Sequence, residues 1–318
     1  MLLNYIKLSF RLMARNPFFS FINVMGLSLG FAAFFVLWQH SQNELRSDRF
    51  HKDYEQIYRL GALGEWNDDK DTWQGSVVGV TGTSMMDILK KSTPVLDHTA
   101  IYPPMSYAVH GSDHAAEISL SYQRPSGDRI SHEETAVVYA EQNFFDFFAF
   151  PLEEGNGTTC LTEPQSVVIS QKTAAKYFGT DNPVGKTIEL NRQIGLTVTG
   201  VFKDLPHNTH FIFDVVISAN RIRSYINSKP DYFATSYCKF PSGTNVKAVE
   251  EKVNSTYPAE VNRAIWGGWS GGRAQLRLQP LTAIAFEALR FDLHHSKSRY
   301  LLQLFSIAAI AGSVSRTT

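Results

Sequence analysis

The chain has 318 residues, of which 43% are hydrophobic and 13% aromatic, and its 30 basic and 30 acidic side chains give a net charge of zero. No run of like charges occurs, which excludes the basic surface that is typical of nucleic-acid-binding proteins. The length allows one large or two small domains with a hydrophobic core.

An uncharged apolar segment lies near the N-terminus. Residues 18–38 carry no charge, and as a helix at 1.5 Å per residue they would extend about 31 Å, the thickness of the hydrocarbon core of a bilayer. A secretory signal peptide is the competing interpretation, because Lys7, Arg11 and Arg15 precede the segment. Signal peptides, however, have shorter apolar regions and end in small residues, not in bulky ones. We therefore expect a transmembrane helix over 17–40.

The residues around this segment predict its orientation. Three cations and no acid precede it, whereas charges of both signs follow it, so the N-terminus is expected in the cytoplasm and the main domain outside. Residues 1–16 place apolar side chains on one helical face and cations on another, which predicts an amphipathic helix on the cytoplasmic side of the membrane. Within the apolar segment Gly26 and Gly30 form a GxxxG pattern, a surface on which another helix can pack closely.

The region after the apolar segment alternates short β-like runs with helical ones, which is typical of an α+β domain. A polar helical continuation is expected after residue 42, a strand from Ile57, a helix over 83–92, and β-like segments over 118–122 and 136–139. Four phenylalanines follow closely on one another, and we expect them in the hydrophobic core: Phe144, Phe145, Phe147 and Phe148.

Residues 164–218 carry the clearest local pattern. The composition predicts a buried strand, then a helix that stops at Gly179, then a turn and three further strands, the second of which ends before Pro206. These elements are expected over 166–170, 171–179, 181–186, 186–190, 196–201 and 211–218.

No motif for catalysis, cofactor binding or metal binding is recognisable. Gly179, Gly185, Lys186 and Thr187 resemble a phosphate-binding loop, but five residues separate the glycines instead of four, and a helix precedes the loop where a strand is needed. The remaining candidates are histidine pairs without a glutamate between them, for which solvent-exposed loop or interfacial positions are the favoured interpretation: His207 with His210, His110 with His114, and His294 with His295.

Two cysteines leave the question of a disulfide open. Cys160 and Cys238 could pair outside the cytoplasm, but a single pair of this spacing defines no disulfide framework.

Several segments, in the same order, resemble the permease subunits of MacB-like and FtsX-like ABC transporters. The resemblance covers most of residues 1–305, and its segments are 11–37, 47–60, 143–155, 166–190 and 198–214. Seven residues in the last two segments are expected to be structural positions of the family motif: Gly179, Pro183, Gly185, Gly200, Asp204, Leu205 and Pro206.

The resemblance implies a permease that transmits movement. A separate cytoplasmic ABC ATPase subunit would hydrolyse ATP, and the movement would reach a periplasmic domain through the membrane helices, for efflux or for handling lipoprotein or envelope substrates. The chain itself would then be no enzyme and need no cofactor. Membrane lipids and a paired permease or second copy are further implied partners, and the bacterial inner membrane is the implied location.

The resemblance also implies the domain organisation. Residues 41–290 would form the periplasmic core domain, with one lobe of roughly 55–110 and 164–285 and another of 111–163. The family continues with a complete second span, whereas residues 299–314 provide only an incomplete transmembrane helix before the sequence becomes polar, so we interpret the reading frame as truncated. The expected fold is a membrane-anchored α+β protein with one N-terminal transmembrane helix, a two-lobed periplasmic domain and the start of a second helix.

Two other functions stay open at this point. A membrane-tethered binding or sensing module without transport activity would fit the truncated sequence. An anchored hydrolase would need acids or histidines that are distant in sequence to meet in space, as the two carboxylates of glycoside hydrolases do.

Overall fold

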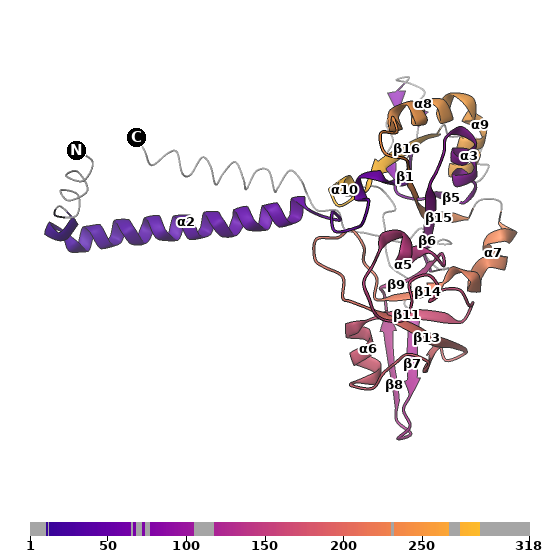
Figure 1. Ribbon diagram of the computed structural model, residues 1–318, viewed down its shortest axis with the longest axis horizontal. Coiled ribbons are helices and arrows are strands. Elements are labelled where there is room, and N and C mark those ends of the chain that lie inside the picture. Colours follow the sequence, from indigo (N-terminus) through magenta and orange to yellow (C-terminus); the bar gives the residue numbers. More distant parts are fainter. Residues whose placement is uncertain are drawn as a thin grey trace. The chain divides into compact units, whose positions relative to one another are not determined.

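The computed structural model describes residues 11, 13–64, 66–67, 72–73, 77–104, 118–229, 232–266 and 274–286 (Figure 1). The chain divides into two compact units, Met1–Arg46 with Ser298–Thr318 and Ser47–Lys297. Some expectations lie outside the described residues, namely most of the helix over 1–16, the incomplete helix over 299–314, and His110, His114, His294 and His295.

The first unit contains the helix α2 (Pro17–Leu45), which is long and apolar enough to cross a membrane. Pro17 lies in its first turn, where a missing backbone N–H leaves no hydrogen bond unmade. The helix ends where the N–H of Arg46 bonds to the carbonyl of Asn43 at 3.2 Å. The helix predicted over 17–40 is therefore confirmed, and it continues to Leu45.

In the described part of the second unit, fourteen strands form one mixed sheet. Along the main path they are β16 (Ala274–Pro280), β1 (Ile57–Gly64), β15 (Phe233–Lys239), β6 (Asp97–Tyr102), β9 (Val137–Ala140), β14 (Val215–Ser218), β11 (Ser166–Ser170), β13 (Ile194–Phe202), β12 (Thr187–Leu190), β7 (Ile118–Gln123) and β8 (Arg129–Glu134). Off this path, β10 (Leu152–Glu154) pairs with β13, β4 (Val77–Val78) with β1, and β5 (Thr81–Gly82) with β15. A separate pair is formed by β2 (Trp66–Asn67) and β3 (Thr72–Trp73).

The sheet consists of two halves joined between β6 and β9, where two residue pairs are in register, Ile101 with Ala140 and Tyr102 with Tyr139. The first half, β16-β1-β15-β6, combines strands from both ends of the domain sequence, whereas the second half, β9 to β8, comes from residues 118–218. The lobe boundaries expected from the family resemblance stay a prediction.

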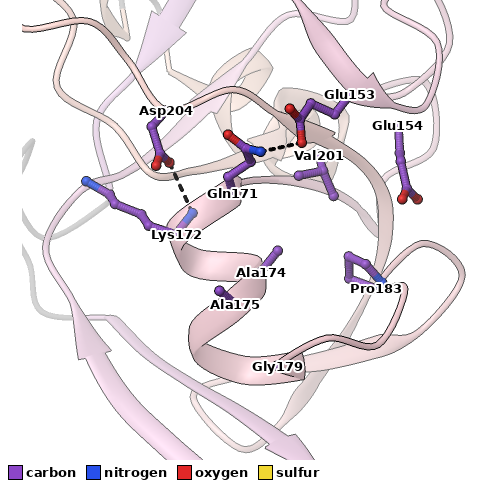
Figure 2. A pocket seen from close by; sticks show the side chains of 10 residues that line it. All are labelled: Glu153, Glu154, Gln171, Lys172, Ala174, Ala175, Gly179, Pro183, Val201 and Asp204. Carbon is purple, nitrogen blue, oxygen red and sulfur yellow. Dashed lines mark hydrogen bonds between the residues drawn. The ribbon is translucent and has the colours of Figure 1, made fainter.

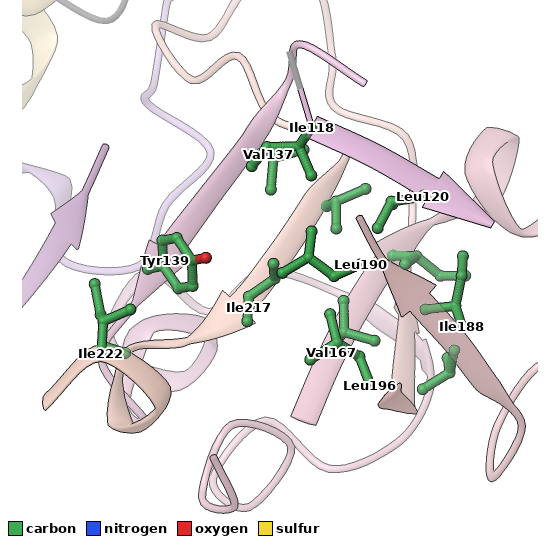
Figure 3. Packing of buried hydrophobic residues seen from close by; sticks show 14 of the residues in the cluster. Ile118, Leu120, Val137, Tyr139, Val167, Ile188, Leu190, Leu196, Ile217 and Ile222 are labelled. Atoms are coloured by element: carbon green, nitrogen blue, oxygen red, sulfur yellow. The ribbon is translucent and has the colours of Figure 1, made fainter. Parts of the chain in front are cut away.

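Helices cover the two halves separately. The first half packs against α3 (Ser84–Ser92), α8 (Val246–Thr256) and α9 (Pro258–Trp266), with a core that includes Leu60, Leu89 and Leu276. In the second half, buried side chains from β7, β9, β11, β12, β13 and β14 meet over the sheet (Figure 3). Further short helices are α6 (Gln171–Phe178), α7 (Arg223–Ser228), α10 (Leu281–Ile284), η1 (Tyr54–Gln56) and η2 (Ala219–Ile222).

The four neighbouring phenylalanines belong to a third cluster of buried residues, which also contains Phe150, Phe202, Phe211 and Phe213 and which we call the phenylalanine core. The helix α5 (Phe144–Phe148) buries all four of them to within 2% exposure, which confirms the expectation from sequence. Their rings meet those of residues far along the chain, for example Phe148 and Phe211 with ring centroids 4.8 Å apart. Edge-to-face ring pairs of this kind stabilise a fold by more than the burial of their apolar area alone. The cluster also includes Ile57 and Tyr237 of the first half, so it packs against both halves of the sheet.

The local pattern over 164–218 is largely confirmed. Ser170 caps α6 by accepting a hydrogen bond from the N–H of Thr173 at 3.3 Å, and Gly179 ends the helix with φ +65°. The fourth strand is shorter than predicted, because β14 begins only at Val215. Its antiparallel partner β11 ends at Ser170, where α6 begins, so residues 211–214 have no strand to pair with on that side.

The two cysteines are free and buried. Cys160 belongs to the phenylalanine core and Cys238 to the core of the first half, and burial raises the pKa of both thiols, that of Cys160 to about 11. The two cysteines therefore do not form a disulfide in this structure.

Gly200 allows close packing between strands, so we expect Gly200→Val to destabilise the domain. A Cβ at this position would lie 3.0 Å from the carbonyl oxygen of Glu154 and 3.4 Å from Cγ1 of Val168. Overpacking of this kind costs about 1–3 kcal/mol, which thermal unfolding followed by circular dichroism would measure. Thr197→Val, at an exposed position on the same strand, is the control and should leave the midpoint nearly unchanged. Equal melting of both variants would contradict the packing argument.

Candidate functional site

A buried carboxylate follows closely after α2. Asp48 lies three residues beyond Leu45, adopts φ +60° and is fully buried. Its backbone N–H donates to the carbonyl of Asn208 at 3.0 Å, and Oδ1 accepts a hydrogen bond from Oγ1 of Thr209 at 2.5 Å. The backbone N–H of His210 lies 3.2 Å from both carboxylate oxygens. The turn after the helix is therefore fixed to a loop 160 residues further along the chain.

Two histidines extend this contact. Nδ1 of His210 lies 2.8 Å from Oδ2 of Asp48, and its Nε2 lies 2.9 Å from the hydroxyl of Tyr237 on β15. His51 bonds through Nδ1 to the backbone carbonyl of Phe148 at 2.9 Å, while its Nε2 faces Oδ1 of Asp48 at 3.8 Å. We call Asp48, His51, Thr209, His210 and Tyr237 the Asp48 network.

The network lies inside the phenylalanine core, and this position determines its charges. The rings of Phe148, Phe150 and Phe211 surround His51 at centroid distances of 4.9–5.8 Å. Burial lowers the pKa of His51 to about 4, although the carbonyl of Phe148 and the carboxylate of Asp48 favour its charged form. Burial opposes ionisation of Asp48 as well, but the contacts from His210 and Thr209 outweigh it and hold the pKa of Asp48 below its ordinary value.

The expectation for one of the loop histidines is wrong. His207 is exposed, as expected, but His210 is only 3% exposed and contacts Asp48. Its acidic partner lies 162 residues earlier, so no local spacing could have shown the pair. Asp48 and His51 also belong to no recognisable motif, and the sequence predicted no role for them, although both lie in the segment 47–60 that carries the family resemblance. The only local sign of a buried polar contact in this segment is that Asp48 and His51 stand beside the aromatic residue Phe50.

The chemistry of the network is structural. An acid, a histidine and a hydroxyl in this order resemble the relay of a hydrolase, but Asp48, His210 and Tyr237 are at most 3% exposed, and their polar atoms bond to one another and to the backbone of the domain. Within the ranges that the structure describes, no group of three or more histidine, cysteine or acidic side chains is arranged to hold a metal ion.

The residues of the family motif lie around α6. Gly179, Pro183 and Asp204 line an open depression of about 470 Å³ beside this helix, together with Glu153 and Lys172 among others (Figure 2). Oδ1 of Asp204 accepts a hydrogen bond from the backbone N–H of Lys172 at 3.0 Å, which satisfies a free donor in the first turn.

The other motif residues are close to this helix in the fold but have separate roles. Gly185 turns the chain with φ +84° and donates its N–H to the carbonyl of Val198 at 2.8 Å. Leu205 and Pro206 line a second depression of about 400 Å³, to which Thr209 and His210 of the Asp48 network also contribute. Gly200 lies in β13, under the carbonyl of Glu154. Of the seven residues, Leu205 and Pro206 lie beside the loop that holds Asp48. Their role as positions of a family motif stays a prediction.

On α2, the structure leaves Gly26 and Gly30 open. Both are exposed, and a Cβ at either position would meet no atom within 4 Å.

The comparisons with known proteins identify the family. The model of the MacB-like periplasmic core domain matches residues 20–256, which include most of α2 and every strand of the sheet except β16. The chain belongs to this family. A search among curated proteins found no match.

Three solved structures are similar to this chain, and the first of them shares its fold. A domain assigned to a permease protein from Porphyromonas gingivalis aligns with a TM-score of 0.54 at 17% identity, over 80% of this chain and 98% of that one. The periplasmic region of MacB from Actinobacillus actinomycetemcomitans aligns at 0.47 and 14% identity, over 72% and 90% of the two chains. The extracellular domain of the ABC-type transporter YknZ from Gram-positive bacteria aligns at 0.44 and 14%, over 70% and 99%. The chain accordingly has a MacB-like periplasmic core domain and an N-terminal apolar helix long enough to cross a membrane.

The burial of His51 predicts a loss of stability on acidification that His51→Asn should reduce. The unfolded chain binds a proton at this histidine near pH 6.5 and the folded domain only near pH 4, so the free energy of unfolding falls as the pH drops between these values. An asparagine amide can donate to the carbonyl of Phe148 in place of Nδ1–H without titrating.

We expect the fall in unfolding free energy between pH 7 and pH 4 to be smaller in His51→Asn than in the parent, by about 1–3 kcal/mol. Urea unfolding of the full chain in detergent micelles at both pH values would measure this difference. The control is His207→Asn, which changes an exposed histidine of the same region and should keep the parent's dependence on pH. If His51→Asn loses as much stability as the parent, the folded domain does not exclude the proton from His51.

Proposed function

We propose that the chain is the permease subunit of a MacB-like ABC transporter, or the N-terminal part of one. In this role it transmits ATP-driven movement from a separate cytoplasmic ATPase subunit to its periplasmic domain, for efflux or for handling lipoprotein or envelope substrates. The observation that carries the proposal is the continuous family match over 20–256, because a single family model includes both the apolar helix and the domain.

Three features of the chain support this role over catalysis. The helix α2 provides a membrane anchor, the net charge of zero fits no polyanionic ligand, and the acid–histidine contacts of the Asp48 network lie between side chains that are at most 3% exposed. We further propose that the protein resides in the bacterial inner membrane with its N-terminus in the cytoplasm, because cations precede the apolar segment and none of the residues before it is acidic.

We expect the tagged full-length chain, extracted from bacterial membranes in mild detergent, to co-purify with an ATPase subunit. The matched control replaces residues 18–38 by a polyleucine span of the same length, which keeps the chain in the membrane but removes the side chains that a partner would recognise. ATPase should accompany the parent and not the control. A parent chain that never associates with an ATPase would favour the alternative, a membrane-tethered binding or sensing module.

We also propose that Gly26 and Gly30 form a helix-packing surface. Their open face allows another membrane helix to approach the backbone closely. Replacing both by isoleucine should reduce association with a second permease chain or copy, by about tenfold if close packing supplies 1–2 kcal/mol, as measured by cross-linking in native membranes. Leu27→Ile with Leu29→Ile, which changes large residues into large residues on the same helix, should leave cross-linking unchanged.

A further inference from the structure

The Asp48 network connects four segments of the domain at one point. The turn that carries Asp48 and His51 is bonded to loop 208–210 through the carboxylate and the carbonyl of Asn208. His210 carries the contact to Tyr237 on β15, and His51 carries it to Phe148 at the end of α5. No two of these segments are neighbours in sequence.

These contacts reach both halves of the sheet. Tyr237 belongs to β15, which pairs with β1 and β6 in the first half. Loop 208–210 leads into β14 of the second half, and α5 follows directly on β9 of the same half. Strand pairing joins the halves only weakly, through two residue pairs between β6 and β9. The Asp48 network therefore adds polar contacts between the halves to the apolar contacts of the phenylalanine core.

Only a short segment of chain connects Asp48 to the end of α2, so the distance between them can change little. Arg46 and Ser47 alone separate it from Leu45, the last residue of α2, so the three steps from Leu45 to Asp48 span at most about 11 Å. Asp48 cannot turn in place, because its fully buried carboxylate would lose hydrogen bonds from Thr209 and His210 and remain charged in an aromatic environment.

We propose that the Asp48 network is the joint through which a displacement of α2 is passed to both halves of the sheet. The proposal rests on the proposed function only for the source of the displacement, the ATPase. The carboxylate pulls loop 208–210 and with it β14, and His210 transfers the same movement to β15 through the hydroxyl of Tyr237.

The experiment replaces the ATPase by the bilayer, so that it does not depend on the proposed partner. The full chain is reconstituted into nanodiscs whose lipids have acyl chains of 14 or 18 carbons, because a change in hydrocarbon thickness alters the tilt of a membrane helix. Amide hydrogen exchange is then compared between the two lipids in loop 204–214, in β15, and in the β7–β8 hairpin, which ends the strand order of the second half.

In the parent we expect exchange in loop 204–214 and in β15 to change by about fivefold between the lipids, and the hairpin to stay constant. Asp48→Asn keeps the shape and tolerates the positive φ of Asp48 but removes the charge, and both segments should lose the response. Tyr237→Phe removes only the hydroxyl that contacts His210, so loop 204–214 should keep the response and β15 should lose it. Lys52→Gln, which changes an exposed side chain in the same turn region, should behave as the parent.

Three results would overturn the proposal: exchange that does not depend on lipid length in the parent, a response retained in folded Asp48→Asn, or loss of the response in loop 204–214 of Tyr237→Phe. Global unfolding of Asp48→Asn would show in the β7–β8 hairpin as well, and Tyr237→Phe alone then decides. A parent that passes these tests but never binds an ATPase would refute the proposed function and leave the joint in place.

Discussion

The rest of the domain depends on one buried negative charge. A carboxylate removed from water is costly unless hydrogen bonds and an opposite or polarisable partner surround it, and Asp48 obtains both from a single loop. Loop 208–210 must therefore stay in place, and Asp204 helps by tying the start of the same loop to α6. The shape of the loop also gives Phe211 and Phe213 their positions in the phenylalanine core. The hydrogen bonds of the Asp48 carboxylate thus also determine where these two phenylalanines pack.

The phenylalanine core strengthens the hydrogen bonds of the Asp48 carboxylate and makes their loss costly. Aromatic rings exclude water from the carboxylate, so hydrogen bonds to it are stronger than at a surface, and any rearrangement that separates it from His210 is correspondingly expensive. The core also packs against β1 and β15 on one side and β11, β13 and β14 on the other. Two sheet halves with a narrow strand connection consequently share one rigid core.

Local sequence was sufficient for much of the fold. The apolar segment predicted α2, the alternation and turn residues predicted β11, α6 and β12 within a residue or two, and the four phenylalanines were correctly expected in the core. These features depend on residues close in sequence. The last strand of the motif was predicted too long because its length is set by its partner β11. The Asp48 network could not be predicted, because its members lie at positions 48, 51, 209, 210 and 237 and no spacing rule joins them.

The order of the strands along the chain affects how the domain can form during synthesis. The second half of the sheet is built from residues 118–218, so its strands can pair as soon as they leave the ribosome. In the first half, β1 and β6 are made early but pair with β15 and β16, which are made last. Until then β1 and β6 lack these partners, although loop 208–210, which bonds to Asp48, is made before both strands. The N-terminal strands therefore remain incompletely paired until the end of the domain has been made, and unpaired strand edges of this kind favour aggregation.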